Sequence, residues 1–338
     1  MLYIRTDMND IIATGHVMRC LAVADAAAGL GEDTTFILSD EHAVCLVEDR
    51  GYHAVVLHTQ WDHMETEAGA LSRVIREHKI KAMLIDSYMV TQRYLEMLSE
   101  MVQVAYIDDL NAFLYPVHTL VCYAGYYKKF CYEKRYRGTK LLLGTQYVPL
   151  GKPFQNMGRK TIRQPMGNLL LLSGGTDRFG ILEGMLGKIN PALYTNIDVI
   201  CGRYYTGYEQ LQEKYRSSSN VHFHKAVTNM EHYMVQADAA VSAGGTSLYE
   251  LCACGTPAVC YSFADNQLDN VQQFQDDGLM DYAGDVRYTD IFERTARLLE
   301  MYACSPKLRQ DRSNRMQKLV DGKGAEKIAA ALIEMQKS

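Results

Sequence analysis

A histidine near the start of the first expected helix is the residue best placed to do chemistry. Residues 2–5 form an apolar stretch typical of a strand, and a polar loop follows before a helix begins at Thr14-Gly15. His16 is therefore expected in the first turn of a helix, at the carboxyl end of a parallel strand, where ligands bind in open α/β sheets. A helix N-terminus carries roughly half a positive charge, which favours an anion and disfavours an imidazolium. A neutral His16 beside a bound anion is a candidate general base, although a helix cap or a phosphate contact fits the same position.

Acidic side chains end two further apolar stretches in the first half of the chain. Asp86-Ser87-Tyr88 follows one of them, and Asp108-Asp109 follows the other. The carboxyl ends of parallel strands meet at one sheet edge, so these residues are expected to converge with Asp7 and His16. Adjacent carboxylates also cap helices, which is the competing interpretation. The convergence of several polar groups favours a ligand site.

Two glycine-rich turns in the second half suggest phosphate binding. Ser173-Gly174-Gly175-Thr176-Asp177 follows one expected strand, and Ala243-Gly244-Gly245-Thr246-Ser247 follows another. Glycines let backbone amides approach a phosphate, and the next helix N-terminus adds a favourable field. Neither turn has the Gly-Lys-Ser/Thr element of an ATP-binding P-loop or a full dinucleotide fingerprint. A single turn of this kind is as often a plain tight turn, but two in one domain favour phosphate.

Polar residues after these turns could hold the rest of a nucleotide or its sugar. Glu250 lies three residues after Ser247, where a carboxylate can accept hydrogen bonds from both hydroxyls of a ribose. Alone, it is better interpreted as a first-turn acid that complements the helix dipole. Asn266-Gln267 begins another expected helix and either binds sugar hydroxyls or caps that helix.

The elements that position these residues alternate between strand and helix along the whole chain. Strands are expected over residues 2–5, 35–38, 54–57, 82–86, 104–108 and 119–122, and then over 169–172, 197–200, 221–223, 239–242 and 258–261. Helices are expected over residues 17–28, 65–77, 91–101, 290–302, 307–320 and 325–335, among others. Strands such as Ala82-Met83-Leu84-Ile85 are apolar on both faces, which is typical of a sheet covered by helices on each side.

A break in this alternation predicts two domains. Residues 149–166 contain Pro149, Gly151, Pro153, Gly158 and Pro165 and show no amphipathic period, so they are interpreted as a linker. We therefore expect an N-terminal Rossmann-like domain over residues 1–148, which carries His16, and a C-terminal Rossmann-like domain over residues 167–338. Two doubly wound α/β domains facing a central cleft form the GT-B architecture of nucleotide-sugar enzymes.

Composition excludes several function classes. The net charge is −5, which gives no reason to expect nucleic acid or a membrane surface as a partner. The longest apolar runs fall far short of the roughly 20 residues that span a bilayer. The first residues already form a strand, and the nine cysteines are scattered and odd in number, which favours reduced thiols and a cytoplasmic location. Cys252 and Cys254 are interpreted as core residues rather than zinc ligands, and no metal site is expected.

The motifs together resemble the UDP-sugar hydrolases of the pseudaminic-acid pathway, relatives of the MurG glycosyltransferases. The resemblance begins with Arg5-x-Asp7 and Gly15-His16-Val17-Met18-Arg19-Cys20 and continues through nearly the whole chain, in order. It includes Ile85-Asp86-Ser87-Tyr88, Tyr106-Ile107-Asp108-Asp109-Leu110, both glycine-rich turns, Glu250, Asn266-Gln267 and Asp321-Gly322-Lys323-Gly324. The chain departs from the family at Ala13, where a glycine is usual, and at Gly151, where an arginine is usual.

The resemblance implies a reaction and a role for each residue. It implies hydrolysis of a UDP-linked 2,4-diacetamido-2,4,6-trideoxy sugar to the free sugar and UDP, with His16 as the base for the attacking water. It implies that Tyr88 and Asn266 contact the sugar, and we group Asp7, Gly15 and Gln267 with them. It implies that the diphosphate and ribose lie on the second turn and its glutamate. The UDP-binding set, with the first turn included, is Gly174, Gly175, Gly244, Gly245, Thr246, Ser247 and Glu250.

The sequence therefore predicts a GT-B-fold hydrolase that acts on a small-molecule UDP-sugar as a monomer and needs no cofactor. Displacement at the anomeric carbon would be assisted by His16, while UDP leaves with its charge held on the loop over residues 244–247. Two alternatives stay open. One is a GT-B glycosyltransferase that passes the sugar to an acceptor, with His16 as the same base. The other is a sugar-nucleotide-binding protein without catalysis, in which His16 only caps its helix.

Overall fold

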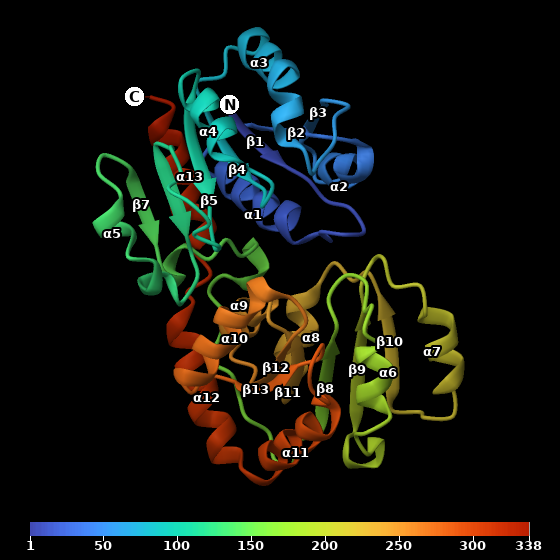
Figure 1. Ribbon diagram of the computed structural model, residues 1–338. Helices are drawn as coiled ribbons and strands as arrows, with labels where there is room; N and C mark the ends of the chain where they lie inside the picture. The colour runs from blue at the N-terminus through green and yellow to red at the C-terminus, as the bar shows by residue number, and fades with distance from the viewer. Residues whose placement is uncertain (338) are drawn as a thin grey trace. The chain divides into compact units, whose positions relative to one another are not determined.

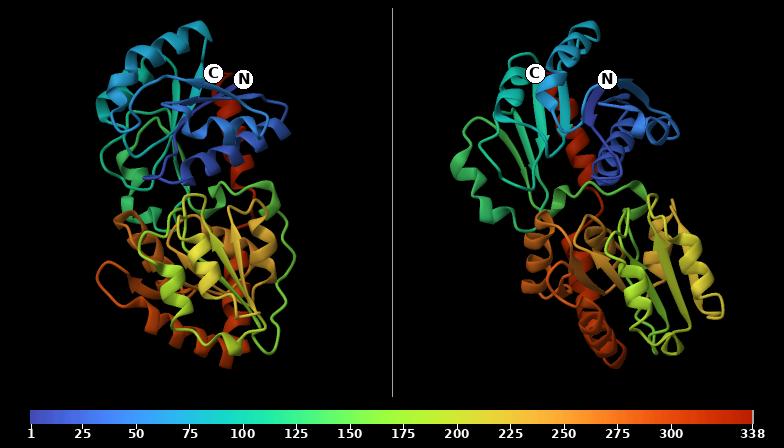
Figure 2. Two further views of the ribbon diagram at one scale, coloured as in Figure 1. Left: turned by 90° about the vertical axis from the view of Figure 1, so that its right-hand side faces the viewer. Right: turned by 45° about the vertical axis from the view of Figure 1, so that its right-hand side comes forward.

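Two parallel α/β units make up the molecule. The computed structural model describes residues 1–337, and these fall into one compact unit of residues 1–152 with 322–337 and a second of residues 153–321. Each unit contains one sheet in which every strand pair is parallel, with helices packed on the sheet (Figures 1 and 2). The prediction of two doubly wound α/β domains is confirmed.

The first unit has a seven-stranded sheet in the order β3-β2-β1-β4-β5-β6-β7. Its central strands are buried along their whole length because helices cover both faces. The strands are β1 (Leu2–Thr6), β2 (Thr34–Leu38), β3 (His53–Val56), β4 (Ala82–Asp86), β5 (Gln103–Ile107), β6 (Thr119–Cys122) and β7 (Lys140–Leu143). The helices are α1 (Gly15–Gly29), α2 (Val44–Glu48), α3 (Ala68–Glu77), α4 (Gln92–Ser99), α5 (Tyr132–Arg135) and α13 (Gly324–Met335).

The second unit has a six-stranded sheet in the order β10-β9-β8-β11-β12-β13. Its strands are β8 (Asn168–Leu172), β9 (Asn196–Cys201), β10 (Val221–Lys225), β11 (Ala239–Ala243), β12 (Ala258–Ser262) and β13 (Asp281–Asp285). Its helices are α6 (Ile181–Leu186), α7 (Tyr208–Lys214), α8 (Met230–Gln236), α9 (Ser247–Cys254), α10 (Asp265–Asp276), α11 (Ile291–Cys304) and α12 (Pro306–Leu319).

Two strands were missing from the sequence prediction. β7 is four residues long, and only Leu142 is buried, so its apolar signal is weak. β13 begins and ends with aspartate and contains Gly284 at φ 128°, a composition that disfavours a strand. Both lie at the end of a sheet, where tertiary pairing rather than local propensity places them.

The predicted domain boundaries need two corrections. Residues 322–337 belong to the first unit rather than the second, because α13 packs along α1 and β4 through Ile328, Ala329 and Leu332, all buried. Most of the expected linker is part of the second unit. There the ammonium of Lys160 is buried at the end of α8 and donates to the carbonyl oxygen of Ala237 at 2.6 Å. Burial lowers the pKa of Lys160 to about 8.

Local signals explain where several helices begin. The hydroxyl of Ser305 accepts the amide of Leu308 and Pro306 is the first residue of α12, a strong helix start. In α3, Leu71 and Ile75 are one turn apart and both are buried against the sheet. Within residues 1–337, no helix is both long and apolar enough to cross a membrane.

Candidate functional site

The candidate residues cluster where the strand order of each sheet reverses. In the first sheet β1 and β4 are neighbours, and the chain builds outward from them in opposite directions (Figure 1). In the second sheet β8 and β11 are neighbours in the same way. Ligands of doubly wound folds bind outside the carboxyl ends of the strands at such a point. His16 follows β1 and Asp86 ends β4, while the two glycine-rich turns follow β8 and β11.

A buried carboxylate orients His16. The Nδ1 atom of His16 lies 2.7 Å from Oδ1 of Asp86, and both side chains are buried. Nδ1 also lies 3.0 Å from Nη2 of Arg19, which can only donate. Because Nδ1 is closer to Asp86, whose ionised carboxylate only accepts, we assign the proton to Nδ1 and a hydrogen bond from Nδ1 to Asp86. The tautomer leaves Nε2 with a free lone pair. This arrangement of base and orienting acid is the one that nucleophile-activating sites use.

Arg19 balances the charge of Asp86. Its Nε and Nη2 atoms donate to the two oxygens of Asp86, each at 2.5 Å. Burial alone would raise the pKa of Asp86, but Arg19 and then His16 outweigh it and hold that pKa well below its usual range. Arg19 lies three residues after His16, on the same face of α1. The sequence contained this spacing, but the sequence prediction gave Arg19 no role.

Tyr88 and Asp109 extend the site beyond the His16–Asp86 pair. The ring of Tyr88 meets the imidazole of His16 edge-on, with 4.6 Å between ring centres. The Tyr88 hydroxyl donates to Oδ2 of Asp109 at 2.9 Å, and Arg19 donates to the hydroxyl of Tyr123 at 2.5 Å. Burial raises the pKa of Asp109, although Arg19 opposes the shift. Tyr88 therefore lies beside His16, and its contact with the sugar stays a prediction.

Asp7 is engaged by protein groups instead. Its Oδ2 accepts from Nη1 of Arg5 at 2.5 Å, and its Oδ1 accepts from the amide of Ser39 at 2.7 Å. Arg5 in turn makes a bidentate pair with buried Glu67, at 2.8 and 2.6 Å. Because both oxygens of Asp7 are occupied, the structure gives it a scaffolding contact; its predicted role in binding sugar is untested.

The loop between β1 and α1 is held in one shape by its own side chains. Oδ1 of Asn9 accepts the amides of Ile11 and Ile12, at 2.9 and 3.0 Å. Ala13 adopts φ 55°, a left-handed conformation that costs a non-glycine residue energy. A glycine would adopt this conformation without that cost. A Cβ atom at Gly15 would meet no other atom within 4 Å, so packing within the protein does not require a glycine at this position.

Asp108 supports the loops around the site. Its carboxylate accepts the hydroxyls of Tyr115, at 2.8 Å, and of Tyr132. It also accepts the amides of Leu110 and Asn111. Asp108 therefore holds a turn, and because no helix begins there the helix-cap interpretation is wrong for this residue. Of the Asp108-Asp109 pair it is Asp109 that lies beside Tyr88.

The first glycine-rich turn is closed by its own carboxylate. Asp177 accepts the amides of Ile181 at 2.8 Å and Leu182 at 3.1 Å, so it occupies the start of α6. Burial raises the pKa of Asp177 to about 6. Gly174 has φ +83°, and the backbone of Gly202 packs so close to the turn that an added Cβ would lie 2.3 Å from the Gly174 oxygen. These contacts give the turn a structural use.

The second glycine-rich turn leaves its helix N-terminus open. No side chain caps α9, and within residues 1–337 the amides of Thr246 and Ser247 have no backbone acceptor. Gly245 has open space where a side chain would stand, whereas a Cβ on Gly244 would lie 2.5 Å from Val271. Open amides at the start of an eight-residue helix suit an anion.

Glu250 lies one turn into α9. Burial raises its pKa to about 7, although a hydrogen bond with Ser247 lowers it. A desolvated carboxylate of this kind is more typical of a ligand-binding acid than of an exposed acid that only complements the helix dipole.

The Asn266-Gln267 pair divides between an exposed and a structural residue. Asn266 is exposed in the first turn of α10. Gln267 is buried, and its Oε1 accepts the amide of Phe263 at 3.0 Å, so it holds the turn between β12 and α10. Asn270, which the sequence prediction missed, donates to the carbonyl oxygen of Gly244 at 3.0 Å and thereby positions the second turn.

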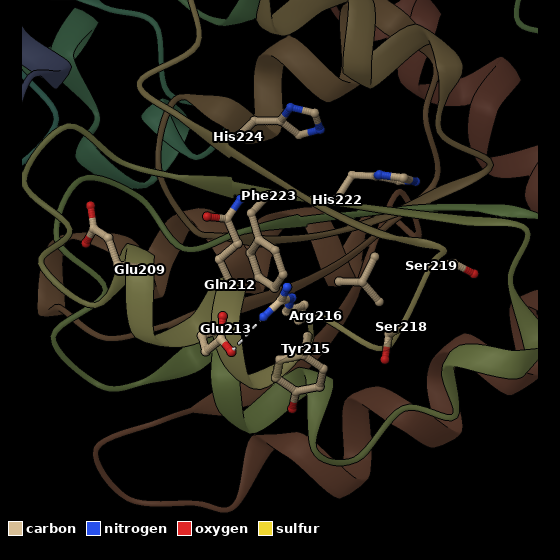
Figure 3. Close-up of a pocket in the computed structure, with 11 residues that line it drawn as sticks. Glu209, Gln212, Glu213, Tyr215, Arg216, Ser218, Ser219, His222, Phe223 and His224 are labelled. Atoms are coloured by element: carbon tan, nitrogen blue, oxygen red, sulfur yellow. Dashed lines mark ion pairs between the residues drawn. The ribbon is translucent and has the colours of Figure 1, made fainter.

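A polar cavity lies elsewhere on the second unit. It has a volume of about 720 Å³ and is lined by residues of α7, β10 and the segment between them, including Glu209, Arg216, His222 and His224 (Figure 3). His224 is paired with Asp198 at 2.8 Å. None of the predicted site residues lines this cavity, and it follows no glycine-rich turn. We therefore place the candidate site at the strand ends.

A family model of known proteins matches most of the second unit. Residues 169–324 match the family model of the glycosyltransferase family 28 C-terminal domain. That range contains both glycine-rich turns, Glu250 and Asn266-Gln267.

Two curated proteins are distantly similar in sequence. The spore coat polysaccharide biosynthesis protein SpsG of Bacillus subtilis is 25% identical over 204 residues, which cover 58% of this chain and 59% of that protein. An uncharacterized protein of Methanocaldococcus jannaschii, MJ1062, is 22% identical over 333 residues, covering 88% of this chain and 66% of that protein. The chain thus spans less than two thirds of the length of either relative.

Solved structures confirm the GT-B fold. MurG of Acinetobacter baumannii superposes with a TM-score of 0.71 at 12% identity, over 98% of this chain and 99% of that chain. The kitacinnamycin glycotransferase superposes with a TM-score of 0.70 at 16% identity, over 99% of this chain and 98% of that chain. The UDP-GlcNAc 2-epimerase of Neisseria meningitidis, solved with UDP-GlcNAc bound, gives 0.67 at 12% identity, over 99% and 100%. These structures, all below 25% identical in sequence, establish the GT-B fold.

Proposed function

We propose that the protein hydrolyses a UDP-linked diacetamido trideoxy sugar to free sugar and UDP, as the resemblance to the pseudaminic-acid pathway hydrolases implies. The observation that carries the proposal is the pairing of His16 with Asp86. The pair fixes the imidazole tautomer and leaves Nε2 as a base. A non-catalytic binding protein would not need a buried, charge-balanced acid behind this histidine.

In the proposed reaction His16 activates a water molecule. Nε2 takes a proton from the water as its oxygen bonds to the anomeric carbon. The bond between that carbon and the phosphate oxygen breaks, and UDP leaves with the electron pair. Asp86 stabilises the imidazolium that forms, and Arg19 keeps Asp86 ionised throughout. Tyr88, beside the imidazole, contacts the sugar.

We propose that the second unit binds UDP at the turn over residues 243–247. The amides of Thr246 and Ser247 donate hydrogen bonds to the diphosphate oxygens, and Glu250 accepts hydrogen bonds from the ribose hydroxyls. The match to the family 28 domain and the fold shared with a UDP-GlcNAc-bound enzyme support this assignment. Amides already aligned at the helix start stabilise the charge of departing UDP without reorganisation.

A glycosyltransferase is the second candidate, and the same comparisons favour it. The matched domain is named for glycosyltransferases, and MurG and the kitacinnamycin enzyme share the fold. His16 would deprotonate an acceptor hydroxyl instead of water. The geometry of the base is the same in both reactions, so the nature of the nucleophile separates them.

The deciding experiment supplies candidate UDP-sugars without any acceptor and follows UDP and free sugar by NMR. Hydrolysis gives both products at equal rates, and in ¹⁸O-labelled water the label enters the sugar. UDP that forms only after an acceptor is added identifies a transferase, and label in UDP identifies phosphorus–oxygen cleavage. Binding of UDP-sugar with no turnover in either condition identifies a non-catalytic binding protein.

The assigned base is tested by His16→Ala. We expect turnover to fall about 10²- to 10⁴-fold, while UDP binding stays at the wild-type level. His42→Ala is a matched control, because His42 pairs with Asp40 at the same 2.7 Å but is exposed. Wild-type turnover in His16→Ala would remove His16 from the mechanism.

A further inference from the structure

Arg178 is an exposed arginine directly after the first glycine-rich turn. Its guanidinium carbon lies 5.1 Å from the ring centre of Phe179 and 5.9 Å from that of Phe263. Within residues 1–337, Arg178 has no ion-pair partner, whereas Arg5, Arg19 and Arg287 are bound to carboxylates. Aromatic rings attract the cation but use none of its N–H donors, so Arg178 is oriented and still able to bind an anion.

A chain of contacts connects Arg178 to the second turn. Phe263 follows β12, and its amide donates to Gln267. The Cβ atom of Gln267 lies 3.1 Å from the position that a Cβ on Gly244 would take. Strands β8 and β12 both pair with β11, so the loops that carry Arg178 and Phe263 flank the loop over residues 243–247 on its two sides.

We infer that Arg178 binds the diphosphate of the nucleotide held at the second turn, an inference that rests on the proposed function. The first turn would then contribute to the nucleotide site through the arginine that follows it, while Asp177 uses the amides that begin α6. A guanidinium makes paired hydrogen bonds with phosphate oxygens. These bonds strengthen as the bond to the sugar breaks, because negative charge grows on the departing phosphate.

The test compares Arg178→Ala with Arg297→Ala, which removes an equally exposed arginine from α11. Calorimetry with uridine, UMP and UDP gives the affinity of each variant for ligands of increasing charge. We expect Arg178→Ala to bind UDP about 10- to 100-fold more weakly, with uridine affinity within twofold of wild type. Arg297→Ala should match wild type for all three ligands.

Two further readouts separate charge from fold. Guanidinium ion added at millimolar concentration should restore part of the UDP-release rate of Arg178→Ala, and Arg178→Lys should lie between Ala and wild type. The inference fails if Arg178→Ala binds UDP as wild type does, or if uridine and UDP affinities fall equally. If wild-type protein binds neither UDP nor uridine, the proposed function itself fails, which is a distinct outcome.

Discussion

The two glycine-rich turns of the second unit share the sequence Gly-Gly-Thr, yet only the helix after the first turn begins with a carboxylate on its amides. After the first turn, Asp177 places a carboxylate on the amides that begin α6. After the second turn, Ser247 occupies the equivalent sequence position, and the amides that begin α9 remain available. A carboxylate of the protein therefore occupies the start of α6, whereas no side chain of the described residues caps the start of α9.

The difference shows that one residue decides whether a carboxylate of the protein occupies the start of the next helix. A carboxylate satisfies the helix N-terminus internally and repels a second anion. A hydroxyl is neutral, so the field of α9 stays available to a phosphate. Glycine content alone does not separate the two cases, because both turns contain two adjacent glycines.

The most direct way to break the comparison is to give the second turn the residue of the first. We expect Ser247→Asp to weaken UDP binding by about 100-fold, because its charge occupies the anion site at close range. Ser247→Asn introduces a side chain of nearly the same shape as aspartate but without its charge, so UDP affinity should fall by less than about tenfold. Titration calorimetry measures both, and equal losses in the two variants would argue against an anion at this turn.

The converse change removes the carboxylate from the first turn. Asp177→Ala leaves two buried amides without an acceptor and should lower the free energy of unfolding by about 1–2 kcal/mol. UDP affinity should stay within about threefold of wild type, because the cap is structural. Urea unfolding gives the stability change, with Asp177→Asn as the variant that keeps one acceptor oxygen. A large loss of UDP binding with unchanged stability would reverse the roles of the two turns.

The pH dependence of uridine binding sharpens the role of Glu250. Because burial raises its pKa to about 7, the carboxylate is mostly protonated at pH 6 and mostly ionised at pH 8. Only the ionised form accepts from both ribose hydroxyls, so uridine affinity should rise with pH, by up to about tenfold across this range. Uridine carries no phosphate that titrates here. Glu250→Gln should remove the slope; a slope that persists in this variant must come from another group.

The contribution of Glu250 to the free energy of unfolding should fall with rising pH, the opposite of the change in uridine affinity. A raised pKa in the folded state means that folding favours protonated Glu250, so this contribution is lost as pH rises from the ordinary glutamate range toward 7. Glu250→Gln should therefore be stabilised relative to wild type at pH 8 more than at pH 5. Thermal unfolding at the two pH values measures the difference.

The smallest expected effects concern left-handed backbone positions. Gly174, in the first glycine-rich turn, has φ +83°, and Ala13, in the loop between β1 and α1, has φ 55°. Of these two positions only Gly174 has the residue that suits a left-handed backbone. We expect Gly174→Ala to cost about 1 kcal/mol and Ala13→Gly to gain about 0.5 kcal/mol, since glycine also has more entropy to lose. Urea unfolding resolves both; destabilisation by Ala13→Gly would show that the entropy loss dominates.

Most of the fold was predictable from strand and helix patterns. Eleven of the strands were found, most of them because they are apolar runs. β7 and β13 were missed because their composition is weak and their pairing is tertiary. Periodicity predicted α13 near its observed limits, but it contains no information about which sheet that helix covers. The assignment of its residues to the second domain was wrong for this reason.

The site was predictable only in part. His16, Tyr88 and the second glycine-rich turn were identified from their positions after strands, and their functional roles remain proposals. The orientation of His16 by Asp86, a residue 70 positions away in sequence, depends on the pairing of β1 with β4 in the sheet. The contacts of Asp7 with Arg5 and Ser39 could not be inferred from the pattern, because any carboxylate at a strand end looks equally available.

The sequence by itself determined the alternation of elements, the strand ends that carry polar groups and the two Gly-Gly-Thr turns, because these follow from local composition and period. Only the tertiary structure decided which polar groups were already satisfied. Hydrogen-bond partners come from distant segments, as with Asp86 and His16, or depend on the local backbone path, as with Asp177 and α6. The start of α6 is capped by Asp177, whereas the start of α9 has no side-chain cap among the described residues. For this reason the second turn is the one that we propose to bind the nucleotide.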